Sequence, residues 1–452
     1  MARTLIRNAT IITMRPETGV LRRADLLTEG ARIAAIAHAI AADEAEVIDG
    51  SAFIVIPGLI NAHMHTWQTG LRAAAANWTL LEYFRWVHAG LATRFTPEDI
   101  HIATLAGALN QLNCGTTTLV DWCHNNPTPA HTDAAVAALR ESGIRAAFFH
   151  GSPKPDPKPG EPHFSEVPHP RAEIERLLAG PFAAKEQLLS LGLAILGPHY
   201  ATIEVARHDF ALARELGLVA SMHQGGGAPK TPGGWEVLDS EGLIGDFVNI
   251  VHGNDLTEAQ LRRFVDLGVT FSATPENEMI AGHGHPITGR LRALGAAPSL
   301  GVDLESVLSG DMLTVARTAL SHQRALDNAA GRAATGAIPS TTTIPTSAAL
   351  SWITTEGARM LRMQDRIGAL APGMQADLVL IRADDLNMVP VHDPVASVVM
   401  QAGLANVDSV MVAGQWRKRH GRLLRDDLDA IKRALTQSGT RILAELGWKE
   451  AA

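Results

Sequence analysis

Apolar and polar positions follow one another along this chain in a rhythm typical of a parallel α/β protein. Beyond about residue 56, short apolar runs bounded by turn residues alternate with longer stretches in which apolar residues recur with the helical period. Segments 129–143 and 256–268 are examples of the predicted helices. The predicted strands are residues 53–65, 115–122, 144–152, 193–201, 217–225, 248–254, 268–274 and 298–303. Eight such strand–helix units predict a closed (β/α)₈ barrel, whose active sites lie at the carboxyl ends of the strands.

The two ends of the chain have a different pattern. Residues 1–56 and 366–420 contain short alternating segments, which predict one small β-sandwich built from both termini. The barrel then occupies residues 57–365, and a C-terminal helix lies within 421–452. The fold class is therefore α/β: a (β/α)₈ TIM-like barrel with a small β-sandwich domain. The Pro-rich segment 151–170 predicts a long loop over the active face, as a lid, a part of the pocket or a surface excursion.

Polar side chains stand where several predicted strands end. His63 and His65 occupy alternate positions, so their side chains point to the same face of a strand. Two neutral imidazoles that converge in this way suit a divalent metal ion, provided that other parts of the chain complete the site. Further predicted strand ends carry His199, His223, His252 and Asp303. The common placement of these residues predicts one site at one end of the barrel.

Composition narrows the classes of partner. The chain has 452 residues and a net charge of -8, which gives no reason to expect nucleic acid or an anionic membrane as partner. Its N-terminal stretch lacks the continuous apolar core of a signal peptide, and no apolar window has the length of a membrane span. Cys114 and Cys123 cannot form a disulfide framework or a four-cysteine zinc site. We expect a cytoplasmic protein, and the abundance of Ala and Arg over Lys suggests a GC-rich bacterial genome.

Several motifs, taken in order, resemble the amidohydrolase superfamily. They are PGLINAHMH, GTTT followed by VDW, GPHYAT, MHQGG, VHGNDL, SLGVD and the tail DRIGALAPGMQADLVL. The resemblance covers about residues 2–420 and is strongest to the branch that contains cytosine and guanine deaminases, S-adenosylhomocysteine deaminase and triazine hydrolases. It implies the barrel fold, a small-molecule substrate, a metal cofactor and the homo-oligomeric state that is usual in this superfamily.

The resemblance also implies roles for individual residues. His63, His65, His223 and Asp303 would bind one divalent metal ion per chain, with zinc favoured and iron as the alternative. The two-metal members use a lysine at the end of the fourth strand, and the matching segment here, LAILGPHYA, has none. His252 would contact the attacking water or the substrate atom under attack, and Asp303 would transfer protons. The metal would lower the pKa of water enough to generate a nucleophile near neutral pH.

The sequence departs from the branch at two positions that carry chemistry. The glutamate expected three residues after His223 is replaced by Gly226, and Ala273 stands where the branch often has a histidine. Three explanations are open. The first is that Asp303 alone carries the protons, the second is that catalysis is lost, and the third is that another group replaces the glutamate: Glu276, Glu278, His283 or His285.

The sequence therefore predicts a metal-dependent hydrolase that cleaves a C–N bond of amide, lactam or amidine type in a small cyclic nitrogenous compound. The alternative is a deaminase of an amino-heterocycle with a relocated acid; dehalogenation, decarboxylation and a non-catalytic scaffold rank lower. Tyr83 is predicted to lie in the core rather than in the pocket. The predicted catalytic residues are Asp303, His252 and Glu276, and the predicted substrate contacts are Trp67, Gln68, His199 and His283.

Overall fold

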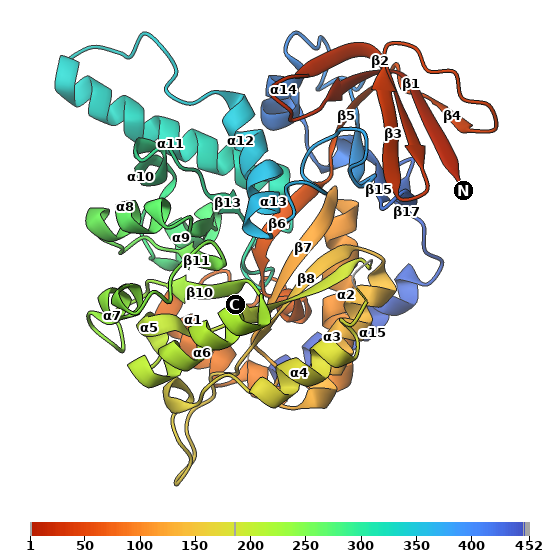
Figure 1. Ribbon diagram of the computed structural model, residues 1–452. Coiled ribbons are helices and arrows are strands. Elements are labelled where there is room, and N and C mark those ends of the chain that lie inside the picture. Colours follow the sequence, from red (N-terminus) through yellow and green to blue (C-terminus); the bar gives the residue numbers. More distant parts are fainter. Residues whose placement is uncertain (1, 185–186, 446, 448–452) are drawn as a thin grey trace.

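The chain forms two β-sheets, one closed into a barrel and one built from both ends of the sequence. The computed structural model describes residues 2–184, 187–445 and 447. In Figure 1 the sheet of the two termini lies beside one end of the barrel. The chain passes from this sheet into the barrel at Gly58, between β5 and β6. This arrangement confirms the predicted fold class.

The barrel sheet contains eight parallel strands in simple sequential order. The last strand returns to the first through a bridge between Met64 and Asp303, which closes the barrel at its carboxyl end. Most of these strands are buried along their whole length, as expected for a parallel sheet that is covered on both faces. The strands are β6 (Leu59–Met64), β7 (Thr116–Cys123), β8 (Arg145–Gly151), β9 (Leu189–Ala194), β10 (Ala220–Gln224), β11 (Val248–His252), β12 (Thr270–Ala273) and β13 (Ser299–Leu300).

Two predicted strands differ from the observed ones. The first apolar run divides between the two sheets, because its first half, β5 (Phe53–Pro57), pairs with strands of the terminal sheet. The run predicted at 193–201 begins earlier, and His199 lies in the short helix α5 (Gly197–Tyr200) beyond the end of β9. Gly197, whose φ is 63°, and Pro198, which fits the first turn of a helix, lead the chain into α5.

The terminal sheet is a single mixed sheet of nine strands. Strands from the N-terminal segment and strands from the C-terminal segment meet where β5 pairs with β14. The predicted β domain of both termini is thus confirmed, with its strands joined edge to edge in one continuous sheet. The other strands are β1 (Arg3–Ile12), β2 (Val20–Glu29), β3 (Arg32–Ala37), β4 (Glu46–Asp49), β14 (Leu378–Arg382), β15 (Val407–Val412), β16 (Gln415–Arg419) and β17 (Arg422–Leu423).

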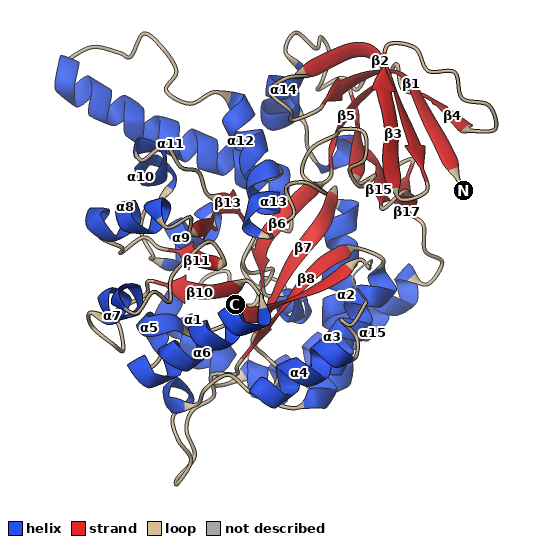
Figure 2. Cartoon of the chain, viewed as in Figure 1, coloured by secondary structure: helices blue, strands red, loops and turns tan. Residues whose placement is uncertain are grey.

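Helices surround the barrel (Figure 2) and begin at residues that the sequence marks for this role. Thr96 and Thr257 each form a reciprocal capping box with the third residue of the following helix, which satisfies backbone donors at the helix start. The helices are α1 (Leu80–Tyr83), α2 (Pro97–Asn113), α3 (Pro129–Ser142), α4 (Arg171–Ala179), α6 (Ile203–Leu216), α7 (Gly234–Ser240), α8 (Glu258–Asp266), α9 (Pro275–Ala281), α10 (Thr288–Ala293), α11 (Met312–Thr335), α12 (Thr346–Trp352), α13 (Thr355–Met360), α14 (Pro394–Ala396) and α15 (Leu428–Glu445).

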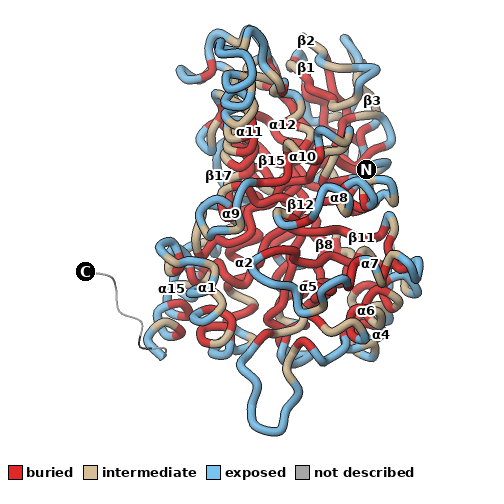
Figure 3. The backbone as a smooth tube through the Cα atoms, turned by 90° about the vertical axis from the view of Figure 1, so that its left-hand side faces the viewer, coloured by how far each residue is buried: buried red, intermediate tan, exposed pale blue. Residues whose placement is uncertain are grey.

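Buried residues run along the barrel strands and the inner faces of the helices (Figure 3), where they form one large hydrophobic cluster and a separate one that contains Val120, Trp122 and Phe149. The loop between β8 and α4 is exposed along most of its length, but its residue Lys154 is buried. Across the described residues we find no helix with the combined length and apolarity that a membrane crossing requires.

Candidate active site

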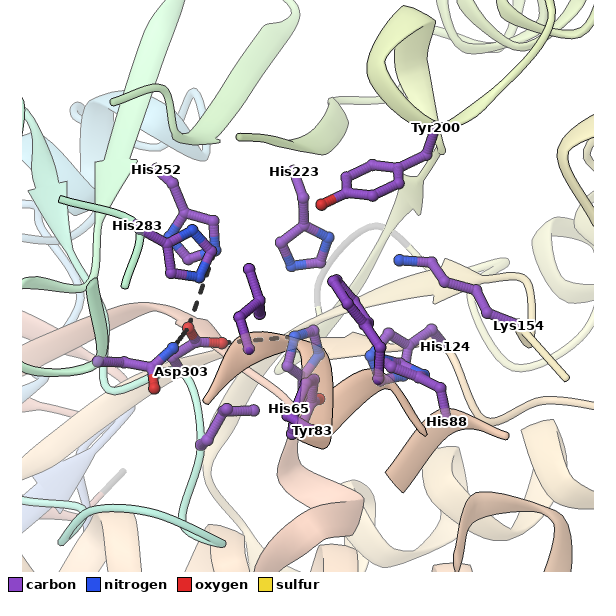
Figure 4. Close-up of a pocket in the computed structure, with 14 residues that line it drawn as sticks. His65, Tyr83, His88, His124, Lys154, Tyr200, His223, His252, His283 and Asp303 are labelled. Carbon is purple, nitrogen blue, oxygen red and sulfur yellow. Dashed lines mark hydrogen bonds and ion pairs between the residues drawn. The ribbon is translucent and has the colours of Figure 1, made fainter. Parts of the chain in front are cut away.

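A narrow pocket opens at the carboxyl ends of the barrel strands. Figure 4 shows the side chains that line it, with histidines from several strands pointing toward one another. The pocket lies at the end of the barrel where the fold places its chemistry.

Three histidines and one aspartate meet at the base of the pocket. The ligand atoms of His63, His65, His223 and Asp303 all lie within 4.8 Å of one another. The Nε2 atoms of His63 and His223 are 3.2 Å apart, and Asp303 Oδ1 lies 3.3 Å from His63 Nε2 and 3.4 Å from His65 Nε2. Ligand atoms of a tetrahedral zinc ion, about 2.1 Å from the metal, lie about 3.4 Å from one another. The observed spacing therefore fits one metal ion.

Backbone contacts fix the orientation of these ligands. The backbone N–H of Asp303 donates to His63 O at 2.9 Å, and the backbone N–H of His65 donates to Asp303 O at 2.9 Å. His65 Nδ1 lies 2.6 Å from the carbonyl oxygen of Trp122, to which it donates, so its Nε2 is free to bind a metal. The same backbone contacts thus close the barrel and bring Asp303 next to His63 and His65.

The protonation states suit metal binding. Burial lowers the pKa of His63, lowers that of His65 to about 3 and holds that of His223 well below its usual value. These rings are neutral near pH 7, which is the form that binds metals. Burial by itself would raise the pKa of Asp303, but the hydrogen bond from His63 and the positive charge of His252 outweigh it and hold this pKa well below its usual range. Asp303 is therefore ionised.

A second group of side chains surrounds the remaining oxygen of Asp303. Asn277 Nδ2 donates to Asp303 Oδ2 at 2.7 Å, and Thr274 Oγ1 donates to the same oxygen at 3.2 Å. His252 Nε2 lies 3.9 Å from it. The second carboxylate oxygen is thus held by the loop and helix that follow β12.

His252 is oriented by a glutamate of the motif TPENEM. Its Nδ1 donates to Glu278 Oε1 at 3.2 Å, and the same oxygen accepts the backbone N–H of Thr274 at 2.8 Å. Burial would lower the pKa of His252, but the hydrogen bond to Glu278 and the charge of Asp303 outweigh it and raise this pKa. His252 also packs against His283, with 4.4 Å between their ring centroids.

The position of the missing glutamate is filled by other residues. A Cβ atom on Gly226 would lie 2.8 Å from Leu80 Cδ2 and 3.1 Å from Tyr200 Oη. Tyr200 Oη donates to the carbonyl oxygen of Gly225 at 2.6 Å, and both Leu80 and Tyr200 line the pocket. A larger side chain at position 226 would therefore collide with the pocket wall, and the site is built without one.

Of the four substrate contacts that the sequence predicts, the structure places one in the pocket wall and three outside it. His283 lines the pocket, whereas Trp67, Gln68 and His199 are buried and absent from the described residues that line it. Trp67 Nε1 donates to His124 Nδ1 at 3.2 Å, and Gln68 Nε2 donates to Tyr83 Oη at 2.6 Å. The two side chains therefore contact residues of the pocket wall from behind.

The predicted acid Glu276 also lies apart from the described pocket residues. Its Oε1 accepts a hydrogen bond from Thr318 Oγ1 of α11 at 3.3 Å. Glu278, two residues further along the same helix, is the carboxylate that contacts His252. Glu276 and Glu278 differ in this way because α9 begins at Pro275, so that positions 276 and 278 face different sides of the helix.

His199 Nδ1 is 3.2 Å from Gln224 Nε2, at the end of β10.

Sequence reasoning missed several residues of the pocket wall. Tyr83 packs into the hydrophobic core, as predicted, and also lines the pocket, and His88, His124 and Lys154 line it as well. Burial lowers the pKa of Lys154 to about 8. The Pro-rich character of segment 151–170, which predicted a loop over the active face, was the one signal that pointed to Lys154.

The fold and the cluster of three histidines and an aspartate define the class of the amidohydrolases, and the comparisons agree. The sequence profile described as "Amidohydrolase family" matches residues 54–417. The chain is 31% identical to 8-oxoguanine deaminase of Pseudomonas aeruginosa, over 95% of this chain and 97% of that protein.

Two solved structures share the fold. One is an adenosine deaminase from Xanthomonas campestris with bound zinc (TM-score 0.81, 23% identity, 98% of this chain and 99% of that chain). The other is a variant of atrazine chlorohydrolase from Arthrobacter aurescens TC1 complexed with zinc and atraton (TM-score 0.82, 23% identity, 96% and 100%). The chain belongs to the amidohydrolase family, which confirms the predicted enzyme class.

Proposed function

We propose that this protein is a metal-dependent deaminase that replaces an amino group on a small nitrogen heterocycle by oxygen and releases ammonia. The observation that carries the proposal is the cluster of His63, His65, His223 and Asp303 at the base of the pocket. His252 and His283 lie over the same cluster.

The four clustered side chains would hold one divalent metal ion. Their donor set and their spacing suit zinc, and iron would bind the same set. The zinc in the structures of the Xanthomonas and Arthrobacter proteins supports zinc as the first choice. When bound, the metal would supply a Lewis acid that makes a water molecule nucleophilic near neutral pH.

The side chains of the pocket would carry the protons of the reaction. Asp303 accepts a proton from the attacking water and returns it to the departing nitrogen, so that the amino group leaves as ammonia. His252, protonated and oriented by Glu278, donates a hydrogen bond from Nε2 to the part of the substrate on which negative charge develops. His283 has a buried Nδ1 without a partner among the described residues and would bind a ring nitrogen.

Two observations favour deamination over hydrolysis of a cyclic amide. Glu278 orients His252, and the ring of His283 packs against it, so that His252 would serve as the relocated proton-transfer group in place of the missing glutamate. In addition, the relative in Pseudomonas aeruginosa and the structural neighbour in Xanthomonas campestris are both named as deaminases.

Ammonia release tests this proposal. The zinc-loaded protein is incubated with a panel of amino-heterocycles (aminopurines, aminopyrimidines, pterin and aminotriazines) and a matched panel of cyclic amides. We expect ammonia and the corresponding oxo compound from at least one amino-heterocycle, with Asp303→Asn lowering the rate by about 10³-fold or more. Ring opening of the cyclic amides without release of ammonia would contradict deamination.

We also infer a cytoplasmic location and a homo-oligomeric state. Cys114 and Cys123 are both free and buried, as is usual in a reducing compartment. Light scattering on the purified protein measures the oligomeric state directly.

A further inference from the structure

We propose that Lys154 binds a negatively charged group of the substrate, so that the enzyme acts on amino-heterocycles that carry a carboxylate or another anionic substituent. This inference rests on the proposed function, because it names the substrate class of the same pocket. It concerns a residue that takes no part in the metal cluster or in the proposed proton transfers.

Lys154 is a buried cation without a counter-ion. Only 9% of the residue is exposed, and burial is the single cause of its lowered pKa, with no hydrogen bond or charged neighbour contributing. Its Nζ lies 4.8 Å from the ring centre of Tyr200 and 5.9 Å from that of Trp122. Such cation–π contacts attract the ammonium group, but they leave its three N–H donors without acceptors among the described residues.

The pocket offers Lys154 no negative partner of its own. Asp303 is the one carboxylate among the described residues that line the pocket, and it is engaged by the histidine cluster. A bound divalent metal would make the pocket still more positive. Burying an unpaired charge is costly, so a ligand that supplies the negative charge gains affinity at this position.

The position of Lys154 fits one end of a small substrate. Figure 4 shows Lys154 and Asp303 on opposite sides of the pocket, with His65 and His223 between them and the Lys154 amine directed to the centre. Lys154 and Tyr200 also line a second, neighbouring pocket, which the oppositely charged Arg85 and Asp156 line as well. A ring placed with its reacting carbon over the metal cluster would therefore direct a substituent on its far side toward Lys154.

Binding of two probes of nearly equal shape tests the inference without depending on turnover. Benzenesulfonate is an anion and a weak metal ligand, and methyl phenyl sulfone is its neutral counterpart. Calorimetry with the zinc-loaded protein should give at least about tenfold tighter binding of the sulfonate, as expected for one charge-assisted hydrogen bond.

Variants assign the preference to Lys154. Lys154→Met should bind both probes equally, and Lys154→Arg should keep the preference for the anion. Lys158→Met is the matched control, because it removes the same charge from an exposed position of the same loop; it should leave the preference unchanged. Equal or unmeasurable binding of the two probes by the wild type, or a preference that persists in Lys154→Met, would overturn the inference.

Turnover separates this inference from the proposed function. Pterin and pterin-6-carboxylate, and cytosine and 5-carboxycytosine, differ only by the anionic group. If the neutral members release ammonia as fast as the carboxylates, the inference fails while deamination stands. If the wild type prefers the anionic probe but no compound in either panel of heterocycles releases ammonia, deamination fails while Lys154 keeps its role as the anion-binding residue.

Discussion

At the scale of single residues, side chains of the short helix α9 orient His252 and Asp303, the two groups that the proposed chemistry uses. Glu278 orients His252, and Asn277 holds the outer oxygen of Asp303. His252 and Asp303 both have positive φ angles, 67° and 70°. Each such conformation costs about 1–3 kcal/mol and persists where the surrounding structure holds it. The backbone strain therefore coincides with the two groups proposed to act on the substrate.

Replacement of Glu278 should impair catalysis through His252. In Glu278→Gln the negative charge that raises the pKa of His252 is lost, so this pKa falls. Because the protonated form of His252 is the active one, the alkaline limb of the kcat–pH profile should move to lower pH. At pH 8 we expect kcat to fall about 10–100-fold, a loss typical of residues that orient a functional side chain.

Glu276→Gln is the matched control for this experiment. Glu276 lies on the same helix and contacts Thr318 on α11, so its replacement should change kcat by less than about threefold. The assignment would be wrong if Glu276→Gln lost the activity, or if Glu278→Gln kept both the rate and the pH profile of the wild type.

The ligand cluster could be predicted at this scale because its residues follow strands whose ends must meet. The choice between Glu276 and Glu278 could not, since it depends on where α9 begins, and neighbouring positions of a helix differ by about 100° in direction. Lys154 and Tyr83 come from irregular or helical segments, and no local pattern shows that such residues face a pocket.

At the scale of elements, β13 joins β6 at the closure of the barrel. Gly301 follows β13, and a Cβ atom at this position would lie 2.5 Å from His63 O and 2.7 Å from His63 N. The two backbones can approach one another here because residue 301 has no side chain. This close approach sets the distance between Asp303 and the two histidines, His63 in β6 and His65 just after it.

Gly301→Ala should therefore affect both stability and metal binding. Overfilling a site of this kind typically costs about 1–3 kcal/mol, and the obstructing atoms belong to backbone. We expect a lower urea midpoint of unfolding and a weaker affinity for zinc.

Gly403→Ala is the control, because a Cβ atom at that position meets nothing within 4 Å. Its stability should differ from that of the wild type by about 0.5 kcal/mol or less. Full stability and full zinc affinity in Gly301→Ala would show that the contact between β13 and β6 can adjust.

The order of strands and helices is the part of the fold that the sequence predicts best, because strand and helix periods differ and the segments are short. The run 53–65 predicts one strand, because it is apolar throughout. In the structure its two halves are separate strands that belong to different sheets. Which sheet an apolar strand joins depends on partners distant in sequence, here β1 and β14.

At the scale of the whole molecule, the terminal sheet and the C-terminal helix support the barrel from outside the pocket. Arg145 on β8 forms a buried, two-pronged ion pair with Asp377, at 2.7 and 3.1 Å, which links the barrel to the terminal segment. Ser438 on α15 donates to Asp99 on α2 at 2.6 Å. Two segments from the C-terminal part of the chain thus brace the barrel whose strand ends carry the ligand cluster.

Metal content is the most direct test of the claim that four convergent side chains form a metal centre. The wild type, His223→Ala and His283→Ala are purified under the same zinc-replete conditions and measured by mass spectrometry of the metal. We predict about one zinc ion per chain in the wild type and in His283→Ala, whose replaced residue lines the pocket outside the ligand set, and much less in His223→Ala. A wild type without metal, or full occupancy in His223→Ala, would contradict the metal centre described above.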